Sequence, residues 1–335
     1  MKENIMAVDF LQKLILGILA FLIMFIVALV FGAADIAVKD VWLALISNEL
    51  GDRATIIREI RLPRVIAGIF VGAALAVSGA IMQGITRNPL ADPGLLGLTA
   101  GANAFLAITI AFVTKANYLI IMLACFFGAA IGAALVFGIG AMKKGGFSPL
   151  RIVLAGAAVS AFLHAITEGI GIYFRVSKEV SMWTSGGLLG TSWNQLQVII
   201  PFITLGILVA LMLSRQLTIL SLSEEVAVGL GQKILHIKVF LFLIIIILAG
   251  ASVALVGNLA FVGLMVPHIV RAIVGTDYRF IIPMSVILGA ITILIADTLA
   301  RTINAPFETP VIAIVAVMGL PFFLFITRKG SKISL

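Results

Sequence analysis

Long hydrophobic runs recur along the whole chain and are separated by short polar connections. Most of these runs reach about 18 residues, which is long enough to cross a hydrocarbon core of about 30 Å as a helix. Apolar and polar residues do not alternate within the runs, so the pattern favours helices over the strands of a membrane barrel. We therefore predict an all-α polytopic membrane protein.

The runs predict ten transmembrane helices in a single permease-type domain that covers residues 1–335, with no soluble domain between them. The spans cover approximately residues 13–33, 63–85, 93–113, 117–141, 150–174, 195–214, 236–256, 258–274, 280–300 and 309–327. The eighth span is short and begins at Gly257-Asn258, so we expect it to be broken or tilted. The first run is too long for the apolar segment of a signal peptide, and we interpret it as a span.

Small residues recur at the spacing that lets membrane helices approach closely. Glycines stand four residues apart in three of the predicted spans, namely Gly68 with Gly72, Gly97 with Gly101, and Gly128 with Gly132. We expect close helix–helix contacts at these positions.

The composition agrees with a membrane protein, because 62% of the residues are hydrophobic, only 11% are charged, and the mean hydropathy is +1.22. A soluble chain of this length needs far more polar surface. Cys125 is the single cysteine, so an intrachain disulfide is excluded.

Lysines and arginines predict the orientation, because cytoplasmic connections carry an excess of them. With the N-terminus in the cytoplasm, 14 of the 23 fall in inner connections and nine in outer ones. The inner set is Lys2, Lys13, Arg87, Lys143, Lys144, Arg151, Arg215, Lys233, Lys238, Arg271, Arg279, Arg328, Lys329 and Lys332. Both termini are therefore predicted to be cytoplasmic. Four arginines share one outer connection, where orientation does not explain them: Arg53, Arg58, Arg61 and Arg64.

Two ionisable pairs stand out near or within the spans. His164 and Glu168 lie four residues apart on one face of the fifth predicted span. Ionisable residues inside a membrane are costly, and they either pair with one another or line a cavity. Both interpretations stay open here: a mutually satisfied buried pair, or a pair that lines a pore. Asp297 and Arg301 repeat the spacing at the outer end of the ninth span, where we expect an ion pair that orients Arg301.

The connection "LSLSEEVAVGLGQKILHIK" (220–238) is short and amphipathic. Glu224 and Glu225 suit the positive end of a helix dipole, and Gly229 and Gly231 end the pattern. The segment is either an ordinary capped loop helix or a docking element for a cytoplasmic partner.

Several kinds of chemistry are not expected of this chain. It contains no Gly-Lys dipeptide and hence no Walker-type phosphate loop, so any ATP must be bound by another subunit. The three histidines lack partners at zinc-site spacing, and we expect neither a metal site nor a cofactor bound by this chain. An intramembrane enzyme has no support, since there is no HExxH motif and no nucleophile–base pair stands out. Nucleic-acid binding has little support, because no basic stripe with interleaved aromatic residues occurs.

Taken in order, the motifs are more specific than any of them alone. "RLPR" leads into "GAALAVSGAIMQGITRNPLADPGLLG", and "SEEVAVGLG", "FVGLMVPHIVR" and "ADTLAR" follow. This series closely resembles the permease family of type II ABC importers, which take up ferric siderophores, haem and cobalamin. The resemblance covers about residues 13–327. "MQGITRN" and "INAPFETPVIAIVAVMGLPFFLF" are most similar to the ferric-siderophore permeases of Gram-positive bacteria.

The resemblance implies a multi-pass permease in a bacterial plasma membrane, which works as a transport subunit and not as an enzyme. It implies a second permease, identical or homologous, two ATPase subunits that use ATP, and an extracytoplasmic substrate-binding lipoprotein. The residues that match the family's docking arginines for the binding protein are Arg61, Arg64 and Arg301. The residues that match its ATPase-coupling helices, within the loop 215–238, are Glu224, Glu225, Ala227 and Gly229.

The resemblance also implies that the fifth span lines the translocation path, although His164 and Glu168 are not part of the family pattern. Their place in the path is an inference from this chain alone. Haem or cobalamin is the alternative cargo within the family. The alternative from another class is a proton-coupled secondary transporter that uses His164 and Glu168 as a proton relay.

Overall fold

The computed structural model describes residues 2–32, 37–46, 51–113, 115–141, 149–184, 187–305 and 307–330. Three residues of the orientation count lie outside these ranges, namely Lys143, Lys144 and Lys332, as does the last residue of the first predicted span. The described part consists of helices and connections, with no strand. The all-α class is confirmed.

The helices follow the hydrophobic runs. Their bounds are α1 (Lys2–Val30), α2 (Val38–Ile46), α3 (Asp52–Thr55), η1 (Ile56–Arg61), α4 (Leu62–Thr86), η2 (Pro93–Leu96), α5 (Leu98–Phe112), α6 (Tyr118–Ala141), α7 (Pro149–Tyr173), α8 (Ser177–Thr184), α9 (Trp193–Met212), α10 (Ser214–Leu222), α11 (Glu224–Gly229), α12 (Ile234–Val256), α13 (Val262–Val274), α14 (Tyr278–Thr302) and α15 (Val311–Gly330).

Seven apolar stretches among the described residues are long enough to cross a membrane as helices. They are Val8–Val30, Asp52–Thr86, Tyr118–Ile139, Leu154–Tyr173, Trp193–Met212, Ile234–Val256 and Tyr278–Thr302. Three further apolar helices, Leu98–Phe112, Val262–Val274 and Val311–Leu324, are shorter. Each of the ten predicted ranges overlaps an apolar helix, but that all ten cross the membrane stays a prediction.

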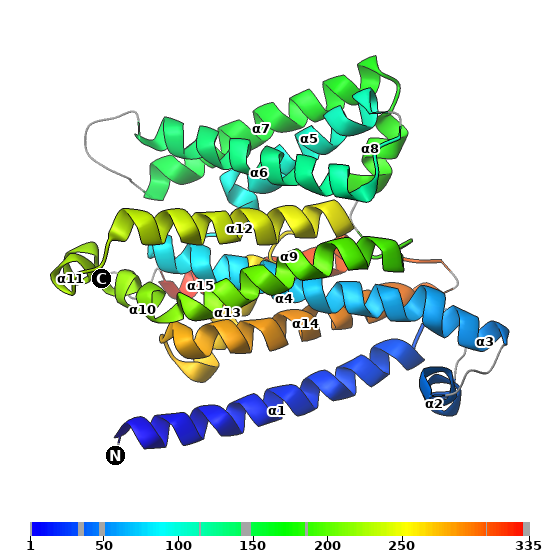
Figure 1. The fold of residues 1–335 in the computed structure, drawn as a ribbon, viewed down its shortest axis with the longest axis horizontal. Helices are drawn as coiled ribbons and strands as arrows, with labels where there is room; N and C mark the ends of the chain where they lie inside the picture. Colours follow the sequence, from blue (N-terminus) through cyan, green and yellow to red (C-terminus); the bar gives the residue numbers. More distant parts are fainter. Residues whose placement is uncertain are drawn as a thin grey trace.

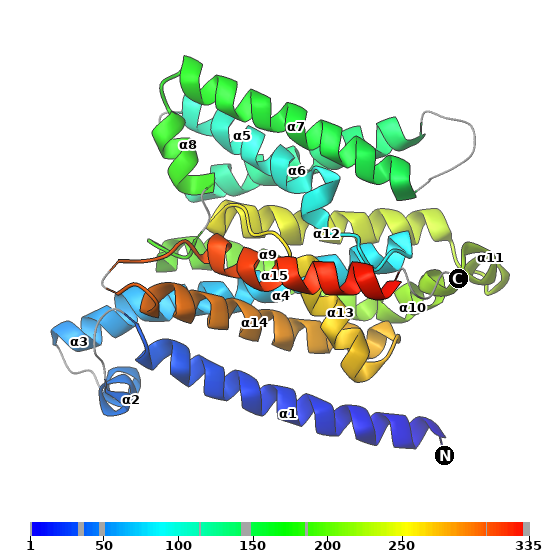
Figure 2. The same cartoon turned by 180° about the vertical axis from the view of Figure 1, so that it is seen from behind.

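The long helices run roughly alongside one another (Figure 1). Helix α4 occupies the centre, with 20 of its 25 residues buried, and it packs against α14, α12 and α13. Helices α5, α6 and α7 form a group on one side of α12, and α1 lies on the opposite side of the molecule against α14 (Figure 2). The start of α1 and the end of α15 lie at the same end as α10 and α11, whereas α2, α3 and α8 lie at the other end.

Glycines set the closest helix contacts, as the sequence predicts. A Cβ atom built on Gly72 would lie 2.2 Å from the carbonyl oxygen of Gly289 in α14. One built on Gly101 would lie 2.0 Å from the carbonyl oxygen of Gly128, so α5 and α6 touch backbone to backbone. This confirms the expected close packing, which in a membrane relies on van der Waals contact.

The expected break near Gly257-Asn258 separates α12 from α13. Gly257 has a φ of 70° and ends α12, and residues 258–260 are not helical. Phe261 has a φ of 69°, in the left-handed region that a bulky residue rarely adopts. This break lies inside the helix bundle, because Gly263, at the start of α13, packs against Gly79 of α4.

Candidate functional site

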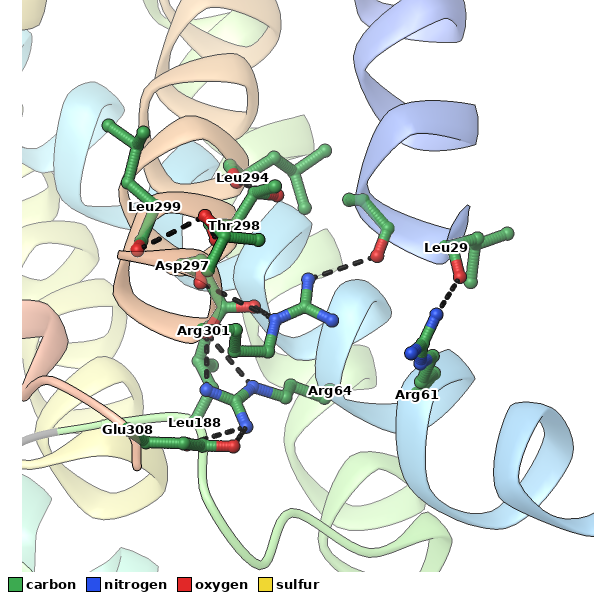
Figure 3. Close-up of polar contacts among 12 residues, drawn as sticks. Leu29, Arg61, Arg64, Leu188, Leu294, Asp297, Thr298, Leu299, Arg301 and Glu308 are labelled. Atoms are coloured by element: carbon green, nitrogen blue, oxygen red, sulfur yellow. Dashed lines mark hydrogen bonds and ion pairs between the residues drawn. The ribbon is translucent and has the colours of Figure 1, made fainter. Parts of the chain in front are cut away.

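An arginine cluster lies where α1 and α14 end and α4 begins, at the end of the molecule away from α10 and α11 (Figure 3). Arg64 in the first turn of α4 donates from Nε and Nη2 to Asp297 Oδ1, at 2.9 and 2.8 Å. Its Nη1 donates to both carboxylate oxygens of Glu308, at 2.8 and 2.9 Å. Arg301 Nε lies 3.0 Å from Asp297 Oδ2, which confirms the predicted ion pair within α14.

The other donors of the cluster hold the end of α1. Arg61 Nη1 donates to the carbonyl oxygens of Leu29 and Val30, at 2.8 and 2.7 Å. Arg301 Nη2 donates to the carbonyl oxygen of Ala28 at 2.9 Å. The last carbonyls of a helix have no intrahelical partner and carry partial negative charge, so two guanidinium groups stabilise this end.

All three predicted docking arginines lie beneath the surface, because Arg61 and Arg64 are 5% exposed and Arg301 is 4% exposed. Their guanidinium groups already bind carboxylates or carbonyls of this chain. The side chain of Glu308 is 30% exposed and covers Arg64 from outside. That these arginines meet a binding protein stays a prediction, and it has to account for these intrachain bonds.

Sequence reasoning missed Glu308 altogether. Arg64 and Glu308 are 244 positions apart, and no local spacing points to their contact. Arg58 lies one helical turn before Arg61, but its Nε donates to the carbonyl oxygen of Ala44, at 2.7 Å. The cluster therefore excludes Arg58 and includes two carboxylates.

The opposite end carries the predicted coupling loop. Ser223 caps α11, with its Oγ accepting from the Val226 N–H at 3.1 Å. Glu225 and Gly229 are exposed and Ala227 is fully buried, while the side chain of Glu224 lies outside the described part. The structure adds three exposed apolar residues that sequence reasoning did not single out: Val226, Val228 and Leu230.

Hydrogen bonds join this loop to α14. Thr218 in α10 donates from Oγ1 to Asp277 Oδ1 at 3.0 Å and accepts from the Tyr278 N–H at 2.9 Å. Burial opposes ionisation of Asp277, but bonds from Arg279 and Thr218 outweigh it and hold the pKa of this carboxyl below its usual value. Helix α14 thus has the coupling loop at its start and Asp297 and Arg301 near its end.

A cavity of about 440 Å³ brings His164 and Glu168 together in the part of the molecule formed by α5, α7 and α8. The lining residues are Asn103, His164, Thr167, Glu168, Gly171, Ile172, Ser177, Val180, Ser181, Thr184 and Asn258. His164 and Glu168 are exposed, and no ion pair joins them in the described part of the chain. The structure thus disfavours a mutually satisfied pair, and their role in a translocation path stays a prediction. Among the described residues, no group of three or more histidines, cysteines or carboxylates could hold a metal ion.

The bundle of long apolar helices, with polar clusters at both ends and a cavity beside α7 lined in part by polar residues, is the architecture of a multi-pass membrane protein. The model of the FecCD transport family matches residues 19–329, and the chain belongs to this family.

Curated relatives match along almost the whole chain. The iron(3+)-hydroxamate import system permease protein FhuB of Bacillus subtilis (strain 168) is 43% identical over 90% of this chain and 79% of its own length. The Fe(3+)-citrate import system permease protein YfmD of the same organism is 41% identical over 93% of this chain and 96% of its own. The hemin transport system permease protein HmuU of Yersinia pestis is 36% identical over 93% and 95%.

The fold is similar to that of a solved transporter described as of the metal-chelate ABC type, in an inward-facing conformation. That structure superposes with a TM-score of 0.80 at 26% identity, covering 95% of this chain and 99% of the other. The predicted family is confirmed. The chain is a permease of the ABC-importer type and a multi-pass protein of the bacterial plasma membrane.

Proposed function

We propose that this chain is the transmembrane subunit of an ABC importer that moves an iron(III)–siderophore complex from an extracytoplasmic binding protein into the cytoplasm. The observation that carries the proposal is the match to ferric-chelate permeases at 41–43% identity over at least 90% of the chain. Haem is the alternative cargo, because a hemin permease matches at 36% identity.

The proposed topology has ten spans with both termini in the cytoplasm. It is supported by the start of α1 and the end of α15, which lie at the same end of the molecule as α10 and α11, the elements that match the family's ATPase-coupling region. The excess of lysine and arginine in the same set of connections supports the same orientation.

Two ATPase subunits are proposed to bind beneath a pair of permeases, this chain and an identical or homologous second one. The α10–α11 region is the proposed contact, with Glu225 and Gly229 exposed on it. Val228 and Leu230 add apolar surface there, and desolvated apolar residues are what the centre of a protein interface needs. ATP would be bound and hydrolysed in those partner subunits.

The binding protein is proposed to dock over the arginine cluster. Arg61, Arg64 and Arg301 supply three positive charges, against two negative charges on Asp297 and Glu308, so the cluster keeps an excess of positive charge. A carboxylate of the binding protein could replace the partly exposed Glu308 on Arg64, while Asp297 keeps its bond to Nε. Bidentate guanidinium–carboxylate geometry would orient the incoming protein.

His164 and Glu168 are proposed to line the translocation path. Both lie on an exposed face of α7, where direct contact with lipid would be costly for ionisable groups. A water-filled path between two permeases removes this cost.

The proposal is tested by uptake of radiolabelled iron in cells with and without this chain. The cells receive a ferric trihydroxamate, ferric citrate or iron-labelled hemin. Loss of ferric-siderophore uptake on deletion, restored by the intact chain, is the expected result. Unchanged uptake of every ferric siderophore, or loss of hemin uptake alone, would contradict the proposed cargo.

A further inference from the structure

We propose that the cavity beside α7 is a cargo-binding site that selects ferric chelates without net negative charge, the class to which neutral ferric trihydroxamates belong. Glu168 sets the charge preference, and Asn103 and Asn258 supply neutral polar contacts. This inference rests on the proposed function above and specifies the cargo within it.

The volume and position of the cavity suit contact with part of a bound chelate. Its volume of about 440 Å³ lies within the range of about 300–1,000 Å³ that is common for small-molecule sites. Four separate segments supply its lining: α5, α7, α8 and the connection after α12. A site formed between packed helices keeps its shape better than one on a single loop.

An unpartnered buried amide oxygen points to a missing hydrogen-bond donor. Asn103 lines the cavity and is only 2% exposed, and its Oδ1 is buried without a hydrogen-bond partner in the described part of the chain. Buried polar atoms without partners are uncommon in folded proteins because they cost free energy. Asn103 therefore brings an unused hydrogen-bond acceptor to the wall of the cavity.

The broken helix beside the cavity is a second, independent sign. Asn258 belongs to the non-helical stretch between α12 and α13, which continues to Phe261 with its left-handed φ of 69°. Non-helical backbone inside a membrane protein is tolerated where protein buries it or where it lines a cavity, and broken helices form substrate sites in other transporters. Strained backbone of this kind clusters at ligand sites.

The charges of the lining give the selectivity. Glu168 is the only carboxylate among the lining residues, and none of them is a lysine or arginine. An anionic chelate would have to bring its charge beside Glu168 with no lysine or arginine in the lining to offset it, where Coulomb repulsion is stronger than in bulk water. Three hydroxamate groups lose one proton each and neutralise Fe³⁺, whereas ferric citrate and ferric catecholates keep negative charge.

The test compares the uptake of two probes: ferrichrome as the neutral trihydroxamate and ferric citrate as the anion. The cells produce either the unaltered full chain or its Glu168→Gln variant. Removing one unit charge is expected to raise the rate of ferric citrate relative to ferrichrome by about tenfold. Glu179→Gln is the matched control, because Glu179 is an exposed glutamate on α8 that does not line the cavity. Its ratio should equal that of the unaltered chain.

Ser181→Lys supplies a second reading that does not depend on how well E168Q assembles. Ser181 lines the cavity, and a cation there should also favour ferric citrate. The inference is overturned if the ratio of ferric citrate uptake to ferrichrome uptake is unchanged in whichever of Glu168→Gln and Ser181→Lys assembles. Failure of the proposed function looks different, because deletion of the chain would then leave uptake of both probes intact.

Discussion

Asp297 is the buried carboxylate that holds the arginine cluster together. It is fully buried and lies within bonding distance of both Arg64 and Arg301. In Asp297→Asn, Arg64 keeps Glu308, but Arg301 loses its carboxylate and retains a backbone carbonyl of α1. Because Arg301 is 4% exposed, the change leaves one buried charge without an opposite charge. Breaking such a buried pair costs about 3–5 kcal/mol.

The assay measures the free energy of unfolding of the purified protein in detergent by denaturant titration. The slope of this free energy against denaturant concentration should be the same in every variant, which checks two-state behaviour. Asp9→Asn is the matched control, since Asp9 and Lys13 form an ion pair at the same spacing with 57% and 34% of their side chains exposed. This exposed pair is worth at most about 0.5 kcal/mol.

A double-mutant cycle separates the lost charge pair from other effects. In an Arg301→Met background the buried cation is gone, so Asp297→Asn should cost less, by at least about 1 kcal/mol. The reasoning would be refuted if Asp297→Asn cost no more than Asp9→Asn, or if its cost were the same in both backgrounds.

Three further outcomes are expected. Gly101→Ala places a Cβ 2.0 Å from the Gly128 carbonyl oxygen and should lower the free energy of unfolding by about 1–3 kcal/mol. Gly138→Ala is the control, because a Cβ there has nothing within 4 Å, and it should be neutral or stabilising. Equal effects of the two substitutions would contradict the packing argument. Asp277 has a lowered pKa, so its contribution to stability is complete above about pH 4 and is lost as the pH falls further. Between pH 3 and 6, the free energy of unfolding of Asp277→Asn should therefore fall less steeply with acid than that of the unaltered chain. Identical pH profiles would refute this. Val228→Glu on the exposed face of α11 should reduce co-purification of the ATPase subunits with the tagged chain, and full recovery of them would exclude this surface as the contact.

The helices could be predicted from sequence because membrane burial acts locally. Each span is a continuous apolar run, and the break after α12 is marked by Gly257-Asn258 itself. The Asp297–Arg301 pair was predictable for the same reason, since four residues along a helix place two side chains on one face. Glycines at close-packing spacing likewise predicted where backbones touch.

The partners of these elements could not be read from local patterns. Arg64 meets Asp297 and Glu308 across 233 and 244 positions, and only the packing of α4 against α14 brings them together. Arg61 binds the end of α1 for the same reason. Asn103 stands in a run of small apolar residues and carries no motif, so its unpartnered oxygen became visible only with the cavity. Ala227 matches the coupling motif, yet it is fully buried within this chain and has no surface to offer a partner.

The central claim is that this chain transports a ferric chelate within an ATP-driven importer. The most direct measurement is uptake of radiolabelled ferric trihydroxamate into proteoliposomes that hold the complex purified through a tag on this chain, with the loaded binding protein outside. Accumulation that requires ATP inside the vesicles and persists after the proton gradient is collapsed is the predicted result. Accumulation driven by a proton gradient without ATP, and abolished by Glu168→Gln, would contradict the account and favour a secondary transporter.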